Sequence, residues 1–265
     1  MIFMYTIGVD LGGTNIAIGI CDKEMNIIAK GSVKTEVSGG TAHIMDNMAR
    51  LIENLLKNNN IKKSDIEYVG IAAPGSVNVA EGVVESSFNL GFNNFPIVAE
   101  LKNRIGIDKI YVANDANAAA IGEMVFGNAR GMKDFAMITL GTGLGSGIVC
   151  NGEMVYGSDG FAGEYGHIAV ESRQTGRQCG CGRRGCLETY VSATGIKRTA
   201  FELMATMTCD SELRSIPYDK FEAKMLSDAA KNNDPIALEA FERTGRILGE
   251  ALADLTAVTS PEAII

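Results

Sequence analysis

The chain reads YTIGVDLGGTNIAIGICD over residues 5–22, a pattern of two short apolar runs joined by glycines. Short apolar runs that are partly β-branched and bounded by glycine are typical of strands rather than helices. The same pattern returns over residues 135–155 as FAMITLGTGLGSGIVCNGEMV. The two copies predict two lobes of related architecture, each with a strand, a glycine turn and a second strand, and a ligand cleft between the lobes.

Between these copies the hydrophobic period becomes helical. An apolar stripe predicts a helix before the polar run 57–60. This stripe consists of Ile44, Met48, Leu51, Ile52 and Leu55. Apolar runs within 66–75 and 109–115 predict buried strands. Strands that alternate with helices indicate the α/β class, and we expect an N-terminal α/β lobe over 1–113 and a C-terminal α/β lobe over 114–265.

The last residues, SPEAII at 260–265, look like the start of another buried strand. Because an α/β lobe rarely ends within a strand, we expect either a truncated C-terminus or a missing tail.

The composition is that of a globular protein without a nucleic-acid or membrane partner. Hydrophobic residues make up 46% and charged residues 21% of the chain, which are ordinary values for a soluble domain. A net charge of −8 argues against a nucleic-acid surface, which usually has a basic face. No apolar run reaches the length of a membrane span, and the N-terminus lacks the basic start of a secretory signal. Clustered cysteines add to the expectation of a cytoplasmic location.

Residues 166–188 carry the strongest chemical signal, GHIAVESRQTGRQCGCGRRGCLE. His167, Cys179, Cys181 and Cys186 are candidate metal ligands, and the glycines among them allow a tight fold-back of the chain. Zinc binds Cys and His tetrahedrally, and four protein ligands without an open position form a structural rather than a catalytic site. The spacing favours such a zinc site, with disulfides and free buried thiols as the alternatives.

The turns of the two repeats, residues 12–15 and 141–147, are candidate phosphate-binding loops. Glycine lets a ligand approach the backbone, so that successive N–H groups can face an anion. The dinucleotide fingerprint is excluded because Ser146 stands at its third glycine and a strand follows instead of a helix. A Walker loop is excluded because the chain has no Gly-Lys pair. A hairpin-type phosphate loop remains, with a plain hairpin turn as the alternative.

Asp115 is the candidate base for a proton transfer. It lies in VANDANAAA (112–120), between a predicted strand and a predicted helix. An Asp in this place can act as a helix N-cap without any chemistry. A carboxylate near a helix N-terminus also stays ionised at neutral pH, ready to accept a proton, and both roles can coexist.

Four motifs together resemble the ROK family of sugar kinases and repressors: DLGGTN at 10–15, LGTGLGSG at 140–147, GEYGH at 163–167 and CGCGRRGCLE at 179–188. The resemblance covers essentially the whole chain, with the motifs in the expected order. It implies an actin-like, ribonuclease-H-like two-lobe fold that holds ATP and a hexose in the cleft between its lobes.

The resemblance implies a sugar site in which Asp115 is the catalytic base. A zinc-bound His167 could turn its second ring nitrogen toward a sugar hydroxyl. Carboxylates and amides suit a hexose, whose hydroxyls both donate and accept hydrogen bonds. The implied sugar-binding residues are Gly75, Asn89, Asn114, Asp115, Glu164, His167 and Glu188.

The resemblance also implies ATP with magnesium. Asp10 is the implied water-mediated partner of the magnesium ion, and its alternative role is to cap the first loop. Asn15 stands where the family often has lysine, so one phosphate contact differs. The implied ATP- and magnesium-binding residues are Asp10, Gly12, Gly13, Thr14, Asn15, Thr142 and Gly143.

The implied activity is ATP-dependent phosphorylation of a hexose, glucose to glucose 6-phosphate in the glucokinase branch that NLGF at 89–92 resembles. The alternative is a sugar-binding regulatory protein of the same family without kinase activity. Repressors of the family carry an N-terminal helix-turn-helix domain, whereas here the first predicted strand starts within a few residues of Met1. A homodimer is the family's common assembly and is expected.

Overall fold

The computed structural model describes residues 4–158 and 160–265. The chain divides into two compact units. One runs up to Gly122 and includes Tyr156–Ala162, and the other consists of Glu123–Val155 and Gly163–Ile265. The boundary between the two units falls after Gly122, inside a helix. The sequence predicts a boundary between residues 113 and 114, at the end of a strand.

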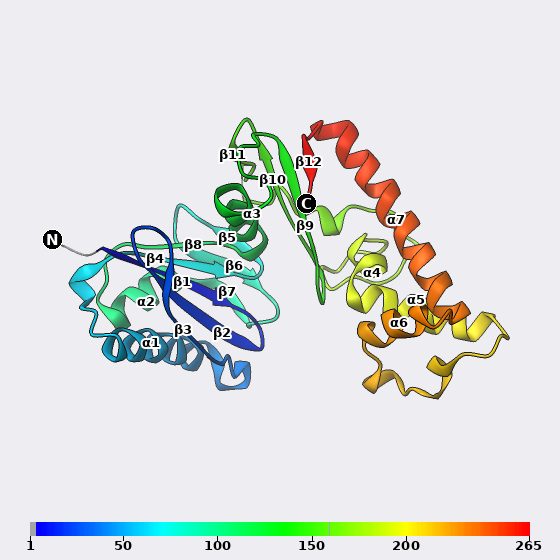
Figure 1. Cartoon of the computed structure of the whole chain (residues 1–265), viewed down its shortest axis with the longest axis horizontal. Coiled ribbons are helices and arrows are strands. Elements are labelled where there is room, and N and C mark those ends of the chain that lie inside the picture. The colour runs from blue at the N-terminus through cyan, green and yellow to red at the C-terminus, as the bar shows by residue number, and fades with distance from the viewer. Residues whose placement is uncertain (1–3, 159) are drawn as a thin grey trace. The chain divides into compact units, whose positions relative to one another are not determined.

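The first unit is built on a five-stranded sheet in the order β3-β2-β1-β4-β8 (Figure 1). Its strands are β1 (Tyr5–Leu11), β2 (Asn15–Cys21), β3 (Ile27–Lys34), β4 (Ile66–Ala73) and β8 (Ile110–Asn114). β1, β2 and β3 are antiparallel neighbours, which confirms the strand, turn and strand predicted for residues 5–22.

β4 and β8 extend the sheet in parallel with β1. Asp10 pairs with Ala72, and Ala73 pairs with Asn114. The carboxyl ends of these three strands therefore lie at one edge of the sheet, which brings the residues that follow each strand to the same region.

Helices cover one face of this sheet. α1 (Gly40–Asn58) buries the whole predicted apolar stripe, and α2 (Ile97–Ile105) packs beside it in the same core (Figure 1). α3 (Asp115–Phe126) starts directly at the end of β8. A small antiparallel sheet completes the unit, with β5 (Ser76–Asn78), β6 (Val83–Ser87) and β7 (Phe92–Phe95).

The second unit repeats the pairing scheme in a sheet of order β11-β10-β9-β12. Its strands are β9 (Phe135–Leu140), β10 (Leu144–Cys150), β11 (Glu153–Met154) and β12 (Ala263–Ile264). β9 and β10 form an antiparallel hairpin, and β12 pairs in parallel with the other side of β9. The order β10-β9-β12 matches β2-β1-β4, so the predicted internal repeat is confirmed, as is a strand in SPEAII.

The helices of the second unit are α4 (Glu188–Val191), α5 (Ala193–Thr206), α6 (Ala223–Lys231) and α7 (Pro235–Thr259). The last three share a core that includes Leu203, Leu226 and Ile236. Short 3-10 helices lie at Val37–Gly39, Lys63–Asp65, Tyr165–His167, Glu212–Ser215 and Tyr218–Lys220. Over the residues that the structure describes, no helix combines the length and apolar character needed to cross a membrane.

Candidate functional site

The junction of β8 and α3 carries the candidate base. Asn114 caps α3, because its Oδ1 accepts the N–H groups of Ala116 at 2.9 Å and Asn117 at 3.1 Å. Its Nδ2 donates to the carbonyl oxygen of Gly75 at 3.0 Å. The capping role considered for Asp115 is therefore filled by Asn114, one residue earlier.

The Asp115 carboxylate has one hydrogen-bond partner among the described residues, the N–H of Ala116. It is exposed, its Oδ1 accepts the already shared N–H of Ala116 at 2.8 Å, and no side chain of the described residues bonds to it. Desolvation by surrounding protein raises the pKa of Asp115; the charge of Asp10 adds to the rise, and the N–H of Ala116 opposes it. The net pKa shift is upward, against the effect of a helix N-terminus alone, and it makes this carboxylate a better proton acceptor than an ordinary Asp.

Two hydrogen bonds fix the turn between β1 and β2, one within the turn and one from Thr35. The N–H of Gly12 donates to the carbonyl of Asn15 at 3.0 Å, and the hydroxyl of Thr35 donates to the carbonyl of Gly12 at 2.6 Å. Asn89 lies beside the turn, since a Cβ on Gly13 would come within 3.6 Å of its Cβ. The structure thus brings a predicted sugar contact next to a predicted ATP contact. The exposed residues of the turn are Gly13, Thr14 and Asn15.

Gly75 is required by packing within the first unit. Its φ is 100°, in the left-handed region, and a Cβ here would overlap the carbonyl oxygen of Ser86 in β6. The sequence suggested that this glycine lets the backbone approach a sugar ring. The close approach seen in the structure is to β6.

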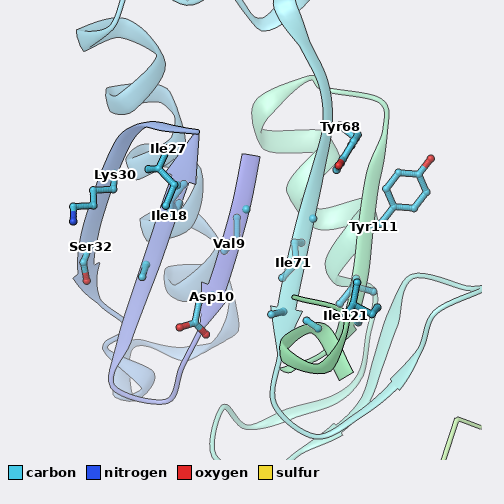
Figure 2. A pocket seen from close by; sticks show the side chains of 18 of the residues that line it. Val9, Asp10, Ile18, Ile27, Lys30, Ser32, Tyr68, Ile71, Tyr111 and Ile121 are labelled. Atoms are coloured by element: carbon cyan, nitrogen blue, oxygen red, sulfur yellow. The ribbon is translucent and has the colours of Figure 1, made fainter. Parts of the chain in front are cut away.

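A hollow of about 1060 Å³ lies on the sheet face opposite α1 and α2. Figure 2 shows Asp10 at the end of β1 and Tyr111 of β8 on its wall. Its floor contains a row of glycines in register, in which Gly8 pairs with Gly19 on one side and Gly70 on the other. Of the predicted site residues only Asp10 lines this hollow, so it is not the predicted hexose site.

The four predicted metal ligands converge in the second unit. The donor atoms of His167, Cys179, Cys181 and Cys186 all lie within 4.8 Å of one another. The Sγ atoms of Cys181 and Cys186 are 3.7 Å apart, and Sγ of Cys179 is 3.7 Å from Nδ1 of His167. With zinc–sulfur bonds of ~2.3 Å, neighbouring sulfurs of a tetrahedral site are about 3.8 Å apart, so donors and spacing fit a tetrahedral cation. The three cysteines of this cluster are free thiols and form no disulfide.

The protein environment of the three thiols is uneven. Burial raises the pKa of Cys179 to about 12 and also raises the pKa of Cys186. Burial acts the same way on Cys181, but hydrogen bonds with Arg183, Cys179 and Cys186 together outweigh it and lower the pKa of that thiol. Buried thiols of this kind become thiolates when a cation supplies the compensating charge.

His167 presents its two ring nitrogens to different neighbours. Nδ1 faces Cys179, while Nε2 lies 3.9 Å from Oε2 of Glu164. Nδ1 is thus placed to bind a cation, whereas Nε2 lies on the side of Glu164. The fold-back of the cysteine motif needs Gly185, whose φ is 76° and whose Cβ would overlap the carbonyl of Glu171.

Glu188 contacts the glycine loop of the second repeat. Its Oε2 accepts the N–H of Leu144 at 2.9 Å, and its Oε1 lies 3.8 Å from Sγ of Cys179. A Cβ on Gly143 would overlap the same Oε2, so a larger residue here would displace the Glu188 carboxylate. The sequence treated Glu188 as a sugar contact, separate from Thr142 and Gly143; the structure joins it to their loop.

The start of α5 also holds this loop, which no sequence pattern indicates. The N–H of Ala193 donates to the carbonyl of Gly141 at 2.9 Å, and the hydroxyl of Thr194 donates to the carbonyl of Thr142 at 2.9 Å. Ser192 caps α5 through the N–H of Gly195. A Ser before a helical pattern is a readable N-cap signal, but a contact between residues 52 positions apart has none.

Comparison with known proteins assigns the chain to a family. Residues 6–265 match the ROK family. The chain belongs to the ROK family. The glucokinase of Halalkalibacterium halodurans is 39% identical over 262 residues, which are 98% of this chain and 78% of the relative.

Solved structures agree with this membership. A ROK family glucokinase from Streptomyces griseus in complex with glucose and AMPPNP has a TM-score of 0.81 at 35% identity, over 98% of this chain and 81% of the other. A ROK family transcriptional regulator has a TM-score of 0.84 at 25% identity, over 98% of this chain and 64% of the other. The predicted actin-like, ribonuclease-H-like two-lobe fold is confirmed.

In this ROK family chain, each unit holds a group of the predicted residues. The first unit holds Asp10, Gly12, Gly13, Thr14, Asn15, Gly75, Asn89, Asn114 and Asp115. The second holds Thr142, Gly143, Glu164, His167, Cys179, Cys181, Cys186 and Glu188. Hydrogen bonds tie Asn114 to Gly75 in the first group, and in the second group Glu188 links the cysteine cluster to the glycine loop.

The capping of α3 predicts different stability effects for two neighbouring residues. Asn114→Ala should lower the free energy of unfolding by about 1–2 kcal/mol, because it removes the cap and leaves the Gly75 carbonyl without its donor. Asp115→Asn should leave the unfolding temperature unchanged or raise it. A carboxyl whose folded pKa is raised loses stability as pH rises from the unfolded value through the folded one, and Asn removes that loss. Thermal and urea unfolding at pH 7 measure both variants; equal losses would contradict this assignment of the cap.

Proposed function

We propose that this ROK family chain is an ATP-dependent hexose kinase with glucose as its preferred substrate. The observation that carries the proposal is the state of Asp115. Asn114 caps the helix, Asp115 accepts only the N–H of Ala116 among the described residues, and its pKa is raised, which favours it as a base. Similarity to two glucokinases over nearly the whole chain supports glucose among the hexoses.

In the proposed reaction, the Asp115 carboxylate accepts the proton of one hexose hydroxyl while the oxygen of that hydroxyl bonds to the γ-phosphorus of ATP. The bond from this phosphorus to the β,γ-bridging oxygen breaks, and ADP leaves with the electron pair. Since Asp115 is exposed, it can pass the proton to solvent after the transfer. Phosphoryl transfer depends mainly on positioning and charge stabilisation, so the loops that hold phosphate matter as much as the base.

The two glycine turns are suited to the phosphates of ATP. Residues 13, 14, 142 and 143 offer backbone N–H and threonine hydroxyl groups, which are donors for phosphate oxygens, whereas the N–H of Gly12 already donates to Asn15. Asp10, exposed at the end of β1, is suited to hold through water the Mg²⁺ that accompanies ATP. That ion supplies neutralisation of the phosphate charge when bound.

We propose a structural zinc ion at the cysteine cluster, on the fit of its four donors. His167 would bind through Nδ1, which leaves Nε2–H for a sugar hydroxyl. Four protein ligands leave no open position, so the ion would shape the site and take no part in the transfer. The proposed sugar-binding residues are Gly75, Asn89, Asn114, Asp115, Glu164, His167 and Glu188.

The second candidate function is sugar-dependent regulation without kinase activity, supported by the structural similarity to a ROK family transcriptional regulator. A regulator needs the sugar contacts and has no use for Asp115 as a base. Turnover therefore decides between the two functions. A homodimer remains the assembly that the family resemblance leads us to expect.

A coupled assay of ADP formation with glucose, fructose, mannose and N-acetylmannosamine tests the kinase proposal. We expect the highest kcat/KM with glucose. Asp115→Asn should lower kcat by about 10²- to 10⁴-fold while glucose still binds, because only the proton acceptor is lost. Asp108→Asn, at an exposed aspartate of the same unit, is the matched control and should keep full activity. Glucose binding by calorimetry without ADP formation on any sugar would favour the regulator.

The raised pKa of Asp115 predicts the acidic limb of the pH–rate profile. The ionised form is the active base, so activity should fall as pH drops through this pKa, at a pH above the ~3.9 of an ordinary Asp. Titration of the Asp115 carboxyl by ¹³C NMR in the nucleotide-free protein measures the pKa directly. Asp10→Asn should lower this pKa by removing a neighbouring negative charge. A titration at or below ~3.9 would contradict the raised pKa.

The proposed metal site predicts joint loss of zinc and activity. Elemental analysis should find one zinc ion per chain in the natural protein and none after Cys181→Ser, and kinase activity should fall with it because His167 loses its anchor. Cys209→Ser, at a free thiol outside the cluster, is the control and should keep both. Full activity in a zinc-free variant would contradict this role.

A further inference from the structure

The glycine loop of the second repeat, residues 141–144, is held by a segment that follows the cysteine cluster in the chain. Ala193 and Thr194 bond to the carbonyls of Gly141 and Thr142. The remaining contact is the N–H of Leu144, which donates to Glu188. Of these contacts, only the one to Glu188 also reaches the cluster.

Glu188 uses its two carboxylate oxygens in two directions. Oε2 accepts the Leu144 N–H at 2.9 Å, and Oε1 lies 3.8 Å from Sγ of Cys179. Gly143 has no room for a Cβ because Oε2 already occupies that space. The carboxylate therefore fits tightly between a metal ligand and the backbone of the loop.

The backbone of Glu188 is fixed by the same neighbours. Leu187, between Cys186 and Glu188, is completely buried in a core that also contains Leu144. The N–H of Leu187 donates to the carbonyl of Ile168 at 3.0 Å, and Ile168 follows the metal ligand His167. A shift of the cysteine motif would therefore move Glu188 relative to the loop.

We infer that Glu188 is a positioning residue that couples the cation site to the glycine loop, so that a bound cation sets nucleotide affinity as well as the geometry of the sugar contacts. The coupling itself stands on the hydrogen bond and the shared core. Its effect on ATP rests on the proposed function, because residues 142 and 143 are proposed to bind phosphate.

Hydrogen exchange of the loop tests the coupling without any assay of activity. Mass spectrometry should follow peptides covering residues 141–147 in zinc-loaded protein and after chelation. In the natural chain, chelation should speed exchange of the loop about tenfold, because the buried Leu144 N–H loses its acceptor. Glu188→Ala should exchange rapidly even with zinc bound, and chelation should change it little.

Two variants separate the coupling from general loosening. Glu188→Gln retains an oxygen that can accept the Leu144 N–H, so the response to chelation should persist. It also keeps the test valid if the alanine variant does not fold. Thr194→Val removes the other side-chain bond to the loop and should raise the basal exchange rate, with the response to chelation retained. A response in Glu188→Ala as large as in the natural chain, or its loss in Glu188→Gln, would overturn the inference.

Nucleotide binding tests the functional half. By calorimetry without hexose, the Kd of AMPPNP should rise about tenfold on chelation of the natural protein and by a similar factor in zinc-loaded Glu188→Ala. An unchanged Kd in both would overturn the effect on nucleotide affinity. If the zinc-loaded natural protein does not bind AMPPNP, the proposed kinase function fails, while hydrogen exchange still decides the coupling.

Discussion

The parallel pairing of β1 with β4, and of β4 with β8, is the constraint on which the first unit depends. It brings the carboxyl ends of three strands to one edge, where Asp10, Gly75 and the pair Asn114–Asp115 follow them. At this edge one amide performs two structural tasks: Asn114 closes the first turn of α3 and holds the carbonyl of Gly75. Asp115 beside it accepts the N–H of Ala116 and is the base of the proposed reaction.

In the second unit, the glycine loop is held by hydrogen bonds from a later segment of the chain. The sheet of this unit is smaller, and the loop at residues 141–144 is held by side chains and N–H groups from the segment 188–194. Four potential metal ligands precede that segment in the chain, and the last of them, Cys186, lies two residues before Glu188. The cluster is thus connected, through buried Leu187 and the carboxylate of Glu188, to the loop whose residues Thr142 and Gly143 are predicted to bind ATP.

Features that depend on neighbouring residues could be predicted from the sequence. The glycine hairpins, the buried stripe of α1 and the convergence of four donors in the cysteine motif follow from short-range patterns, and the structure has all of them. Features that depend on distant partners could not. Asn114 reaches a carbonyl 39 positions away, and Glu188 reaches an N–H 44 positions away. The sequence offered Asp115 as a possible cap because it cannot show which of two adjacent polar side chains turns back onto the helix.

The row of Gly8, Gly19 and Gly70 has an energetic consequence for the first unit. A strand glycine loses more backbone freedom on folding than alanine would, roughly 0.5–1 kcal/mol each, and a Cβ at any of the three would meet no atom within 4 Å. The face with this row therefore contributes little to cohesion, which comes from the face covered by α1 and α2. At these three glycines no side chain covers the backbone of three adjacent strands. A ligand or a protein segment that packs on this face can therefore approach the main chain of the sheet more closely than side chains would ordinarily allow.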